Sequence, residues 1–417
     1  MDIYTFLREY QLNEGVNQSL FAGNRNKTRQ EELQINGETV NLLINEFWTA
    51  GQRQASSLHE ISYRACFKAQ LPRFFISLLT APDDLVYDPF MGRGTTLLEA
   101  ALLERDVAGN DINPLSRILI EPRLSIPAKE EILARLRAIP LDEQARADLD
   151  LSMFYHRRTE GQLVSLRRYL QKRAAQGTED AADRWIRMVA TSRLTGHSKG
   201  FFSVYTLPPN QAVSAERQSL LNARRGQQPE YRDVKTLIVR KTYSLLKDIP
   251  EKLRLSLNAR GKKALFLTAD ARRTAKIAAG SVGLTVTSPP FLDVVQYARD
   301  NWLRCWFNNI DETAVEQGVT MAGNVAAWTA VMEQVFSELY RVTRDQGWVA
   351  FEVGEVRGGS VRLEEHVIPA AARAGFHCRG VLINEQHFTK TANIWGVRNN
   401  EAGTNSNRVV LLQKTGK

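Results

Sequence analysis

The chain has 417 residues, of which 43% are hydrophobic and 24% charged, a composition typical of a globular protein of one large domain with an insertion, or of two domains. It has no apolar run long enough to span a membrane, no signal-peptide pattern at its start, and only three widely spaced cysteines. We therefore expect a cytoplasmic protein without a membrane span, a disulfide framework or a metal, of open oligomeric state.

The net charge of +9 is concentrated in one part of the chain. Residues 151–240 contain 16 Lys and Arg against 7 Asp and Glu, so this segment carries the whole surplus. A local excess of positive charge is typical of proteins that bind nucleic acid, because phosphates neutralised by Lys and Arg release counterions. A solvated helical surface is the alternative.

The first half of the chain begins with polar, irregular residues over 1–55, where we expect no regular element. A helix is predicted over Ala69–Leu79, then a strand over Leu85–Tyr87, a helix over Leu97–Glu104 and a second strand over Val107–Asn110. This order is typical of the opening of a doubly wound α/β domain.

The alternation then gives way to helices. They are predicted over Ala128–Ala147, Thr159–Arg173, Ala181–Thr191 and Tyr231–Leu246, with a loop over Thr195–Asn210. We interpret the chain as an N-terminal extension (1–55), a first part of the catalytic domain (56–120), a basic helical insertion for target recognition (121–260) and a second catalytic part (261–417).

In the last part, strands are predicted again. They cover Ala264–Leu267, Leu284–Thr287, Trp348–Val353, Gly380–Asn384 and Arg408–Gln413, with helices over Val325–Val342 and Glu365–Ala374.

The first candidate site is the turn Asp88-Pro89-Phe90-Met91-Gly92-Arg93-Gly94-Thr95-Thr96, which follows the first predicted strand. Its glycines allow a ligand close to the backbone, and the helix start offers free N–H groups. Asp111, at the end of the next strand, is placed to accept hydrogen bonds from ribose hydroxyls. We predict a cofactor site at Asp88, Pro89, Phe90, Gly92, Gly94, Thr95, Thr96 and Asp111; a purely structural glycine turn is the alternative.

The second candidate site is Thr287-Ser288-Pro289-Pro290-Phe291, again at a strand end. An amino group on a nucleobase is a poor nucleophile because its lone pair is delocalised into the ring. Acceptors aimed at its N–H bonds localise that pair, and Ser288 Oγ and the Pro289 carbonyl are suited to this, with Phe291 stacking on the base. We predict Ser288, Pro289, Pro290 and Phe291 as catalytic residues; a proline turn is the alternative.

Both motifs resemble those of the amino-methylating DNA methyltransferases. Gly109–Pro114 resembles the family's second motif, Thr268–Ala271 the segment whose acid, here Asp270, lies near the adenine, and Phe67–Pro72 the element that closes over the methionine moiety. The resemblance implies a class I fold, with a Rossmann-like seven-stranded, mostly parallel sheet that ends in an antiparallel hairpin. It also implies S-adenosylmethionine as cofactor, with Phe67, Lys68 and Asp270 as further cofactor residues.

The resemblance further implies methyl transfer to the exocyclic amino group of a base flipped out of DNA. Ser288 is more typical of the N4-cytosine members than of the N6-adenine members, which carry Asp or Asn there. Cytosine N4 is our first expectation; adenine N6, RNA methylation and a non-catalytic DNA-binding module are the alternatives, and a restriction–modification role stays open. Methylation at cytosine carbon five is excluded, because no cysteine follows a proline.

Basic and aromatic residues of the insertion, with one residue after the catalytic turn, are candidates for nucleic-acid contact. They are Arg193, His197, Lys199, Phe201, Arg224, Arg225 and Tyr297. For the loop residues, packing into the protein core is the alternative.

Overall fold

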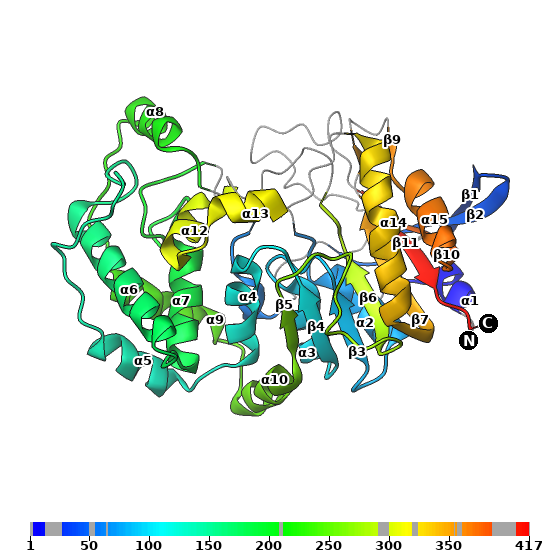
Figure 1. Cartoon of the computed structure of the whole chain (residues 1–417), viewed down its shortest axis with the longest axis horizontal. Coiled ribbons are helices and arrows are strands. Elements are labelled where there is room, and N and C mark those ends of the chain that lie inside the picture. The colour runs from blue at the N-terminus through cyan, green and yellow to red at the C-terminus, as the bar shows by residue number, and fades with distance from the viewer. Residues whose placement is uncertain are drawn as a thin grey trace, which may run out of the picture.

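The computed structural model describes residues 3–12, 27–49, 55–63, 66–207, 212–290, 300–318, 324–353, 355–356, 361–385 and 406–416 (Figure 1). Its strands are β1 Arg29–Ile35, β2 Glu38–Asn45, β3 Leu85–Asp88, β4 Asp106–Asn110, β5 Leu265–Leu267, β6 Val282–Thr287, β7 Thr343–Val353, β8 Glu355–Val356, β9 Val361–Arg362, β10 His377–Glu385 and β11 Ser406–Gln413. Its α-helices are α1 Ile3–Arg8, α2 Gln70–Leu79, α3 Thr95–Leu102, α4 Leu115–Ile120, α5 Lys129–Ala138, α6 Arg157–Ala175, α7 Ala181–Arg193, α8 Ala215–Arg225, α9 Val234–Leu245, α10 Glu251–Lys263, α12 Trp302–Asn308, α13 Glu312–Gly318, α14 Val325–Val342 and α15 Glu364–Arg373. No helix among these residues is long and apolar enough to cross a membrane.

One sheet organises the molecule, with the strand order β1-β2-β10-β11-β7-β6-β3-β4-β5. The strands from β7 to β5 run parallel to one another, β11 is antiparallel to both of its neighbours, and β2 pairs in parallel with β10. Because parallel strands end at the same edge, the segments after β3, β4, β5 and β6 meet along one side of the sheet.

The sheet is covered on both faces. On one face α2 and α3 contribute Phe75 and Leu97 to a core that continues into the helices of the insertion through Trp185. On the other face α14 and α15 contribute Phe336 and Val367 to a second core. Figure 1 shows α14 and α15 on one side of the sheet and the helical lobe of α5 to α9 beyond β5.

The N-terminal segment corrects two predictions. Residues 1–55 were expected to lack regular elements, but they contribute α1 and the hairpin β1–β2, which extends the sheet beyond β10. The sheet therefore has nine strands rather than seven, and the antiparallel pair β10–β11 is internal rather than at its edge.

The insertion is helical, as predicted, but its helices differ in detail. The helix expected over Ala128–Ala147 ends at Ala138, because Pro140 disfavours helical backbone in the residue before it. Helices α8 and α10 were not predicted, and α10 packs against α3 and β4 as the crossover helix that leads into β5.

Part of the insertion's positive charge is neutralised internally. Asp183 is fully buried and accepts ion pairs from Arg135 (2.7 Å) and Arg173 (2.8 Å), and Arg187 pairs with Glu179 (2.5 Å). The local surplus therefore overstates the charge available to a partner.

Candidate active site

The turn between β3 and α3 places two glycines at the carboxyl edge of the sheet. Gly92 and Gly94 have φ angles of +48° and +78°, in the region that favours glycine. A Cβ on Gly94, the N-cap of α3, would lie 2.6 Å from Cβ of Ile120. A Cβ on Gly92 would meet only the Tyr63 ring, at 3.6 Å, and Phe90 O, at 4.0 Å. Gly94 thus fits the turn against α4, whereas a Cβ at Gly92 would make only ordinary van der Waals contacts with the described residues.

Asp88 ends β3 and ties it to β6. Its side chain is buried, and Oδ1 accepts hydrogen bonds from the Thr287 hydroxyl (2.6 Å) and the Phe90 backbone N–H (3.1 Å). Burial raises the pKa of Asp88 to about 7, although these hydrogen bonds favour the anion. The carboxylate therefore joins the two predicted motifs from within the sheet.

We expect Asp88→Asn to stabilise the protein more at pH 8 than at pH 4. The pKa of Asp88 is about 7 in the folded protein and about 4 in an unfolded chain, so stability falls as pH rises between these values. An amide keeps an acceptor oxygen and loses no proton. The gain in free energy of unfolding should therefore be about 2–4 kcal/mol larger at pH 8. Denaturant titrations at both pH values measure it, and a difference that does not vary with pH would contradict the assignment.

Two acids follow the next strands. Asp111, after β4, accepts backbone hydrogen bonds from Gly92 (2.9 Å) and Asn113 (2.9 Å), one on each carboxylate oxygen. Burial raises the pKa of Asp111. Asp270, after β5, accepts from the Arg272 guanidinium Nε (2.9 Å) and backbone N–H (2.9 Å), and the hydrogen bonds from that guanidinium lower its pKa. Both acids are held in fixed orientations by the surrounding chain.

Asn110, which the sequence analysis gave no role, joins three strand ends. Its buried amide Nδ2 donates to the carbonyls of Pro89 (3.2 Å) and Ala269 (2.9 Å), and its Oδ1 accepts from the Ala269 N–H (3.1 Å). One side chain thereby fixes the spacing of the segments after β3, β4 and β5.

Arg93 also had no predicted role. Its Nη1 donates to the carbonyls of His59 (3.2 Å) and Ile61 (2.8 Å). These bonds hold the segment 57–63 against the glycine turn, so that Tyr63 lies beside Gly92.

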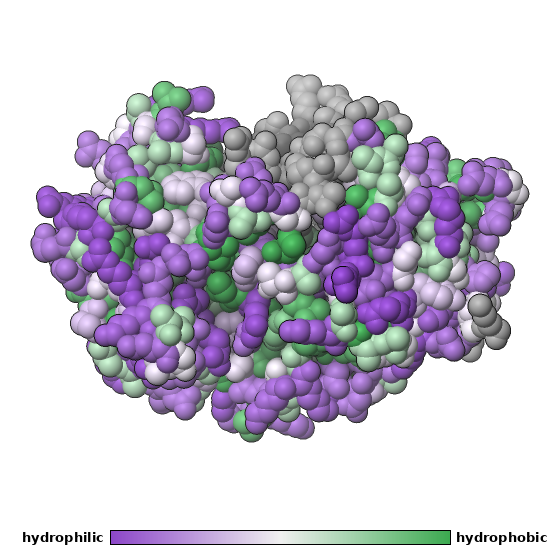
Figure 2. All heavy atoms as spheres, viewed as in Figure 1, coloured by the Kyte–Doolittle hydropathy of each residue, from purple (hydrophilic) through white to green (hydrophobic). Residues whose placement is uncertain are grey.

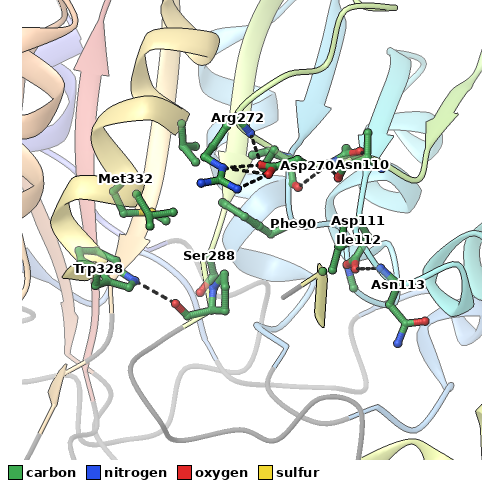
Figure 3. A pocket seen from close by; sticks show the side chains of 18 of the residues that line it. Phe90, Asn110, Asp111, Ile112, Asn113, Asp270, Arg272, Ser288, Trp328 and Met332 are labelled. Carbon is green, nitrogen blue, oxygen red and sulfur yellow. Dashed lines mark hydrogen bonds and ion pairs between the residues drawn. The ribbon is translucent and has the colours of Figure 1, made fainter. Parts of the chain in front are cut away.

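The Ser288-Pro289-Pro290 turn follows β6. Trp328, on α14, donates its indole N–H to the Pro290 carbonyl (3.0 Å) and anchors the turn (Figure 3). Phe291 lies outside the described residues. Trp328 was not identified from the sequence, because nothing local links it to a turn 38 residues earlier.

Gly92 and Ser288 line the same cavity, which lies at the carboxyl edge of the sheet (Figure 3). The predicted residues that line it are Pro89, Phe90, Gly92, Asp111, Asp270, Ser288 and Pro290. The lining residues that were not predicted include Tyr63, Asn110, Arg272, Trp328 and Met332. Within the described part of the chain, no cluster of His, Cys, Asp or Glu is arranged to hold a metal.

Six other predicted cofactor residues do not line this cavity: Asp88 and Gly94, described above, and Phe67, Lys68, Thr95 and Thr96. Phe67 packs against the core, and Lys68 is exposed before α2. Thr95 and Thr96 are buried at the start of α3, where the Thr96 hydroxyl donates to the Val286 carbonyl (3.0 Å). The threonines thus connect α3 to neighbouring segments, as Asp88 connects β3.

The loop residues predicted to touch nucleic acid fall into two groups. Phe201 is buried, packs onto Gly196 and has the Arg193 guanidinium 4.0 Å from its ring centroid. Its burial favours the core-packing alternative. His197 and Lys199 are exposed at the tip of the same loop.

Arg224 and Arg225 are exposed at the end of α8, and Arg225 lies 4.0 Å from the ring centroid of Tyr205. Leu220, on the same helix, is 73% exposed. Figure 2 shows hydrophobic atoms among hydrophilic ones at the tip of this lobe. Tyr297 lies outside the described residues.

The strand order, read from β5 as β5-β4-β3-β6-β7-β11-β10 with β11 antiparallel, is that of a class I S-adenosylmethionine-dependent methyltransferase. The glycine turn follows the central strand β3, and the Ser-Pro-Pro turn follows its neighbour β6. Fold and site together define the class.

Comparisons with known proteins agree with this class. Residues 16–118 match the N6_N4_Mtase family model, described as DNA methylase. The chain is 35% identical over 65 residues to the type II methyltransferase M.MjaI of Methanocaldococcus jannaschii, a match that covers 16% of this chain and 22% of that relative. These matches show similarity to DNA methylases over the first part of the chain, and the chain spans less than a quarter of the length of the curated relative it matches.

Solved structures share little more than general architecture. TTHA0409 of Thermus thermophilus matches with 22% identity over 36% of this chain and 52% of its own, with a TM-score of 0.23. The rRNA methyltransferase aviRa of Streptomyces viridochromogenes matches with 12% identity over 86% of this chain and 89% of its own, with a TM-score of 0.35. The class therefore rests on the strand order and not on these matches.

Proposed function

We propose that this protein transfers a methyl group from S-adenosylmethionine to the exocyclic amino group of a base in DNA. The observation that carries the proposal is the shared cavity of Gly92 and Ser288, since methyl transfer requires the donor and the accepting amine in one enclosed space. A non-catalytic module would not need the two motifs to share a cavity.

The residues around the cavity fit the donor. S-adenosylmethionine supplies an electrophilic methyl group on a sulfonium. The Asp111 carboxylate has lone pairs beyond the two backbone bonds it accepts, suited to the ribose hydroxyls, and Asp270 offers acceptor oxygens for an adenine amino group. Phe90, Met332 and Tyr63 add apolar walls. The turn at Gly92 leaves backbone room for the methionine moiety.

The Ser288 hydroxyl, which lines the cavity, accepts a hydrogen bond from the amine, which localises the nitrogen lone pair toward the methyl group. The Pro289 carbonyl, predicted for the same role, is not among the residues that line the cavity, so its part stays a prediction. Trp328 occupies the Pro290 carbonyl and so fixes the direction of the turn. Cytosine N4 is the first target, because the residue before Pro-Pro is a serine; adenine N6 is the second.

The test is incubation of the protein with methyl-labelled S-adenosylmethionine and either unmethylated genomic DNA or total RNA, followed by mass spectrometry of the nucleosides. N4-methylcytosine in DNA is expected. N6-methyladenine in DNA would change the proposed target from cytosine N4 to adenine N6. Label in RNA alone would overturn the proposal that DNA is the substrate. Binding of DNA without any transfer would support a non-catalytic module.

We also propose that α8 and the tip of the 195–207 loop face the DNA. They lie on the side of the molecule where the parallel strands end (Figure 1), and they carry exposed Lys199, Arg224 and Arg225. A basic surface on this side of the molecule suits a duplex whose base enters the cavity.

Arg224→Ala should weaken DNA binding and reduce the slope of log Kd against log salt by about 1, because one phosphate contact releases about one counterion. Fluorescence anisotropy with a labelled duplex at several salt concentrations measures the slope. Arg117→Ala, on α4, removes another exposed arginine, one that pairs with Glu121, and serves as the control. Equal slopes for wild type and Arg224→Ala would remove α8 from the interface.

A further inference from the structure

Glu352 is a partly buried carboxylate beside Ser288 that the predicted motifs do not include. The parallel ladder pairs Thr287 of β6 with Phe351 of β7. The residues that follow these two, Ser288 and Glu352, are therefore neighbours. The Ser288 hydroxyl hydrogen-bonds the Glu352 carboxylate. On the opposite side, the Asn407 amide of β11 donates to Glu352 Oε1 at 2.6 Å.

Glu352 has hydrogen-bond partners but no cationic partner among the residues that the structure describes. Among the described residues no Lys or Arg forms an ion pair with it, whereas the buried Glu364 pairs with Arg408 at 2.6 Å. Burial raises the pKa of Glu352, and within the described part of the chain the Cys66 thiol is a titratable group that interacts with it. A partly buried acid whose described partners are all neutral is unfavourable for stability, so its place beside a reactive hydroxyl indicates a functional reason.

Glu352 does not line the cavity, whereas Ser288 does. Any effect of Glu352 on a bound base must therefore pass through Ser288. A hydroxyl has one hydrogen to donate and two lone pairs that accept. If that hydrogen is donated to Glu352, both lone pairs remain available to the amine.

We propose that Glu352 is the positioning residue of Ser288: it holds the hydroxyl hydrogen away from the base and takes up the proton that Ser288 relays after methyl transfer. This inference rests on the proposed function. As the bond from carbon to nitrogen forms and that from carbon to sulfur breaks, the nitrogen gains a positive charge. It then loses a proton to Ser288 Oγ, the proton of that hydroxyl moves to Glu352, and Glu352 releases it to solvent.

Glu352→Gln tests the proposal, because the amide preserves shape and removes the charge. With labelled S-adenosylmethionine and unmethylated genomic DNA, single-turnover transfer should fall about 100-fold, with the Kd for S-adenosylmethionine within about twofold of wild type. The wild-type rate should rise with pH as Glu352 ionises, and the variant should lack this rise. Glu364→Gln, which removes a fully buried carboxylate elsewhere in the molecule, should keep the rate within about threefold. An equal loss there would overturn the proposal.

Two further readouts separate positioning from a structural role. Since burial disfavours the charged form of Glu352, Glu352→Gln should raise the Tm at pH 8 while it lowers the rate. In a Ser288→Ala background, Glu352→Gln should change the remaining rate less than about threefold, because the residue through which it acts is gone. A further loss of about 100-fold there would overturn the inference. A wild-type protein that methylates neither DNA nor RNA would overturn the proposed function and this inference with it, whereas a fully active Glu352→Gln would overturn this inference alone.

Discussion

Replacing Ser288 with alanine is expected to lower single-turnover methyl transfer on the order of 100- to 1,000-fold. The hydroxyl is the only side-chain acceptor that the Ser-Pro-Pro turn offers to an amine, and without it the nitrogen lone pair stays delocalised into the base. The fold should not change, because Thr287, Asp88 and Trp328 hold the turn through other atoms. Rapid-quench assays with labelled S-adenosylmethionine measure the rate. Calorimetry should find that the variant binds S-adenosylmethionine with the same Kd as the wild type.

Ser281→Ala is the matched control for this loss. Ser281 directly precedes β6, whereas Ser288 directly follows it. The Ser281 hydroxyl donates to the Ala278 carbonyl (2.7 Å). That variant should transfer methyl groups at the wild-type rate. Full activity of Ser288→Ala would remove the hydroxyl from the proposed chemistry, while a parallel loss of cofactor binding would mean that Ser288 serves the donor and not the base.

The fold was predictable where the pattern is local. Helix α14 has the bounds expected from its periodicity, Val325–Val342, and the apolar runs that became β3 and β6 are followed by turn residues as expected. Strand β1 was missed because most of its side chains are exposed at the sheet edge, so no alternating pattern forms. Its partner β2 joins β10 by pairing Leu42 with Val381, a contact that no local pattern records.

The candidate site, like the fold, was predictable only where its residues form a local sequence pattern. The Gly-containing and Ser-Pro-Pro turns could be placed together because parallel strands end at one edge. Their supports could not: the bond from Trp328 to Pro290 and the place of Glu352 beside Ser288 depend on registers between segments far apart in the chain. Asn110 is next to Asp111, which was predicted. Its role in joining strand ends could not be predicted, because it depends on a hydrogen bond to Ala269, which is 159 residues away.

Gly94→Ala is expected to lower the free energy of unfolding by about 2–5 kcal/mol and to weaken binding of S-adenosylmethionine. The left-handed φ of +78° costs about 1–2 kcal/mol with a Cβ, and a methyl group 2.6 Å from the Ile120 side chain adds about 1–3 kcal/mol of overpacking. The collision would push the turn, and Gly92 with it, out of position. Denaturant titration and calorimetry with S-adenosylmethionine measure the two effects.

Two variants divide that loss into its causes. Gly177 has a φ of +67° with nothing within 4 Å of the position that an alanine Cβ would occupy, so Gly177→Ala should show only the backbone cost of about 1–2 kcal/mol. Ile120→Ala removes the colliding side chain, so Gly94→Ala should cost about 1–3 kcal/mol less in that background than alone. If Gly94→Ala were no more harmful than Gly177→Ala, the close contact between the turn and α4 would not hold in solution, and the glycine would be required for its backbone angle alone.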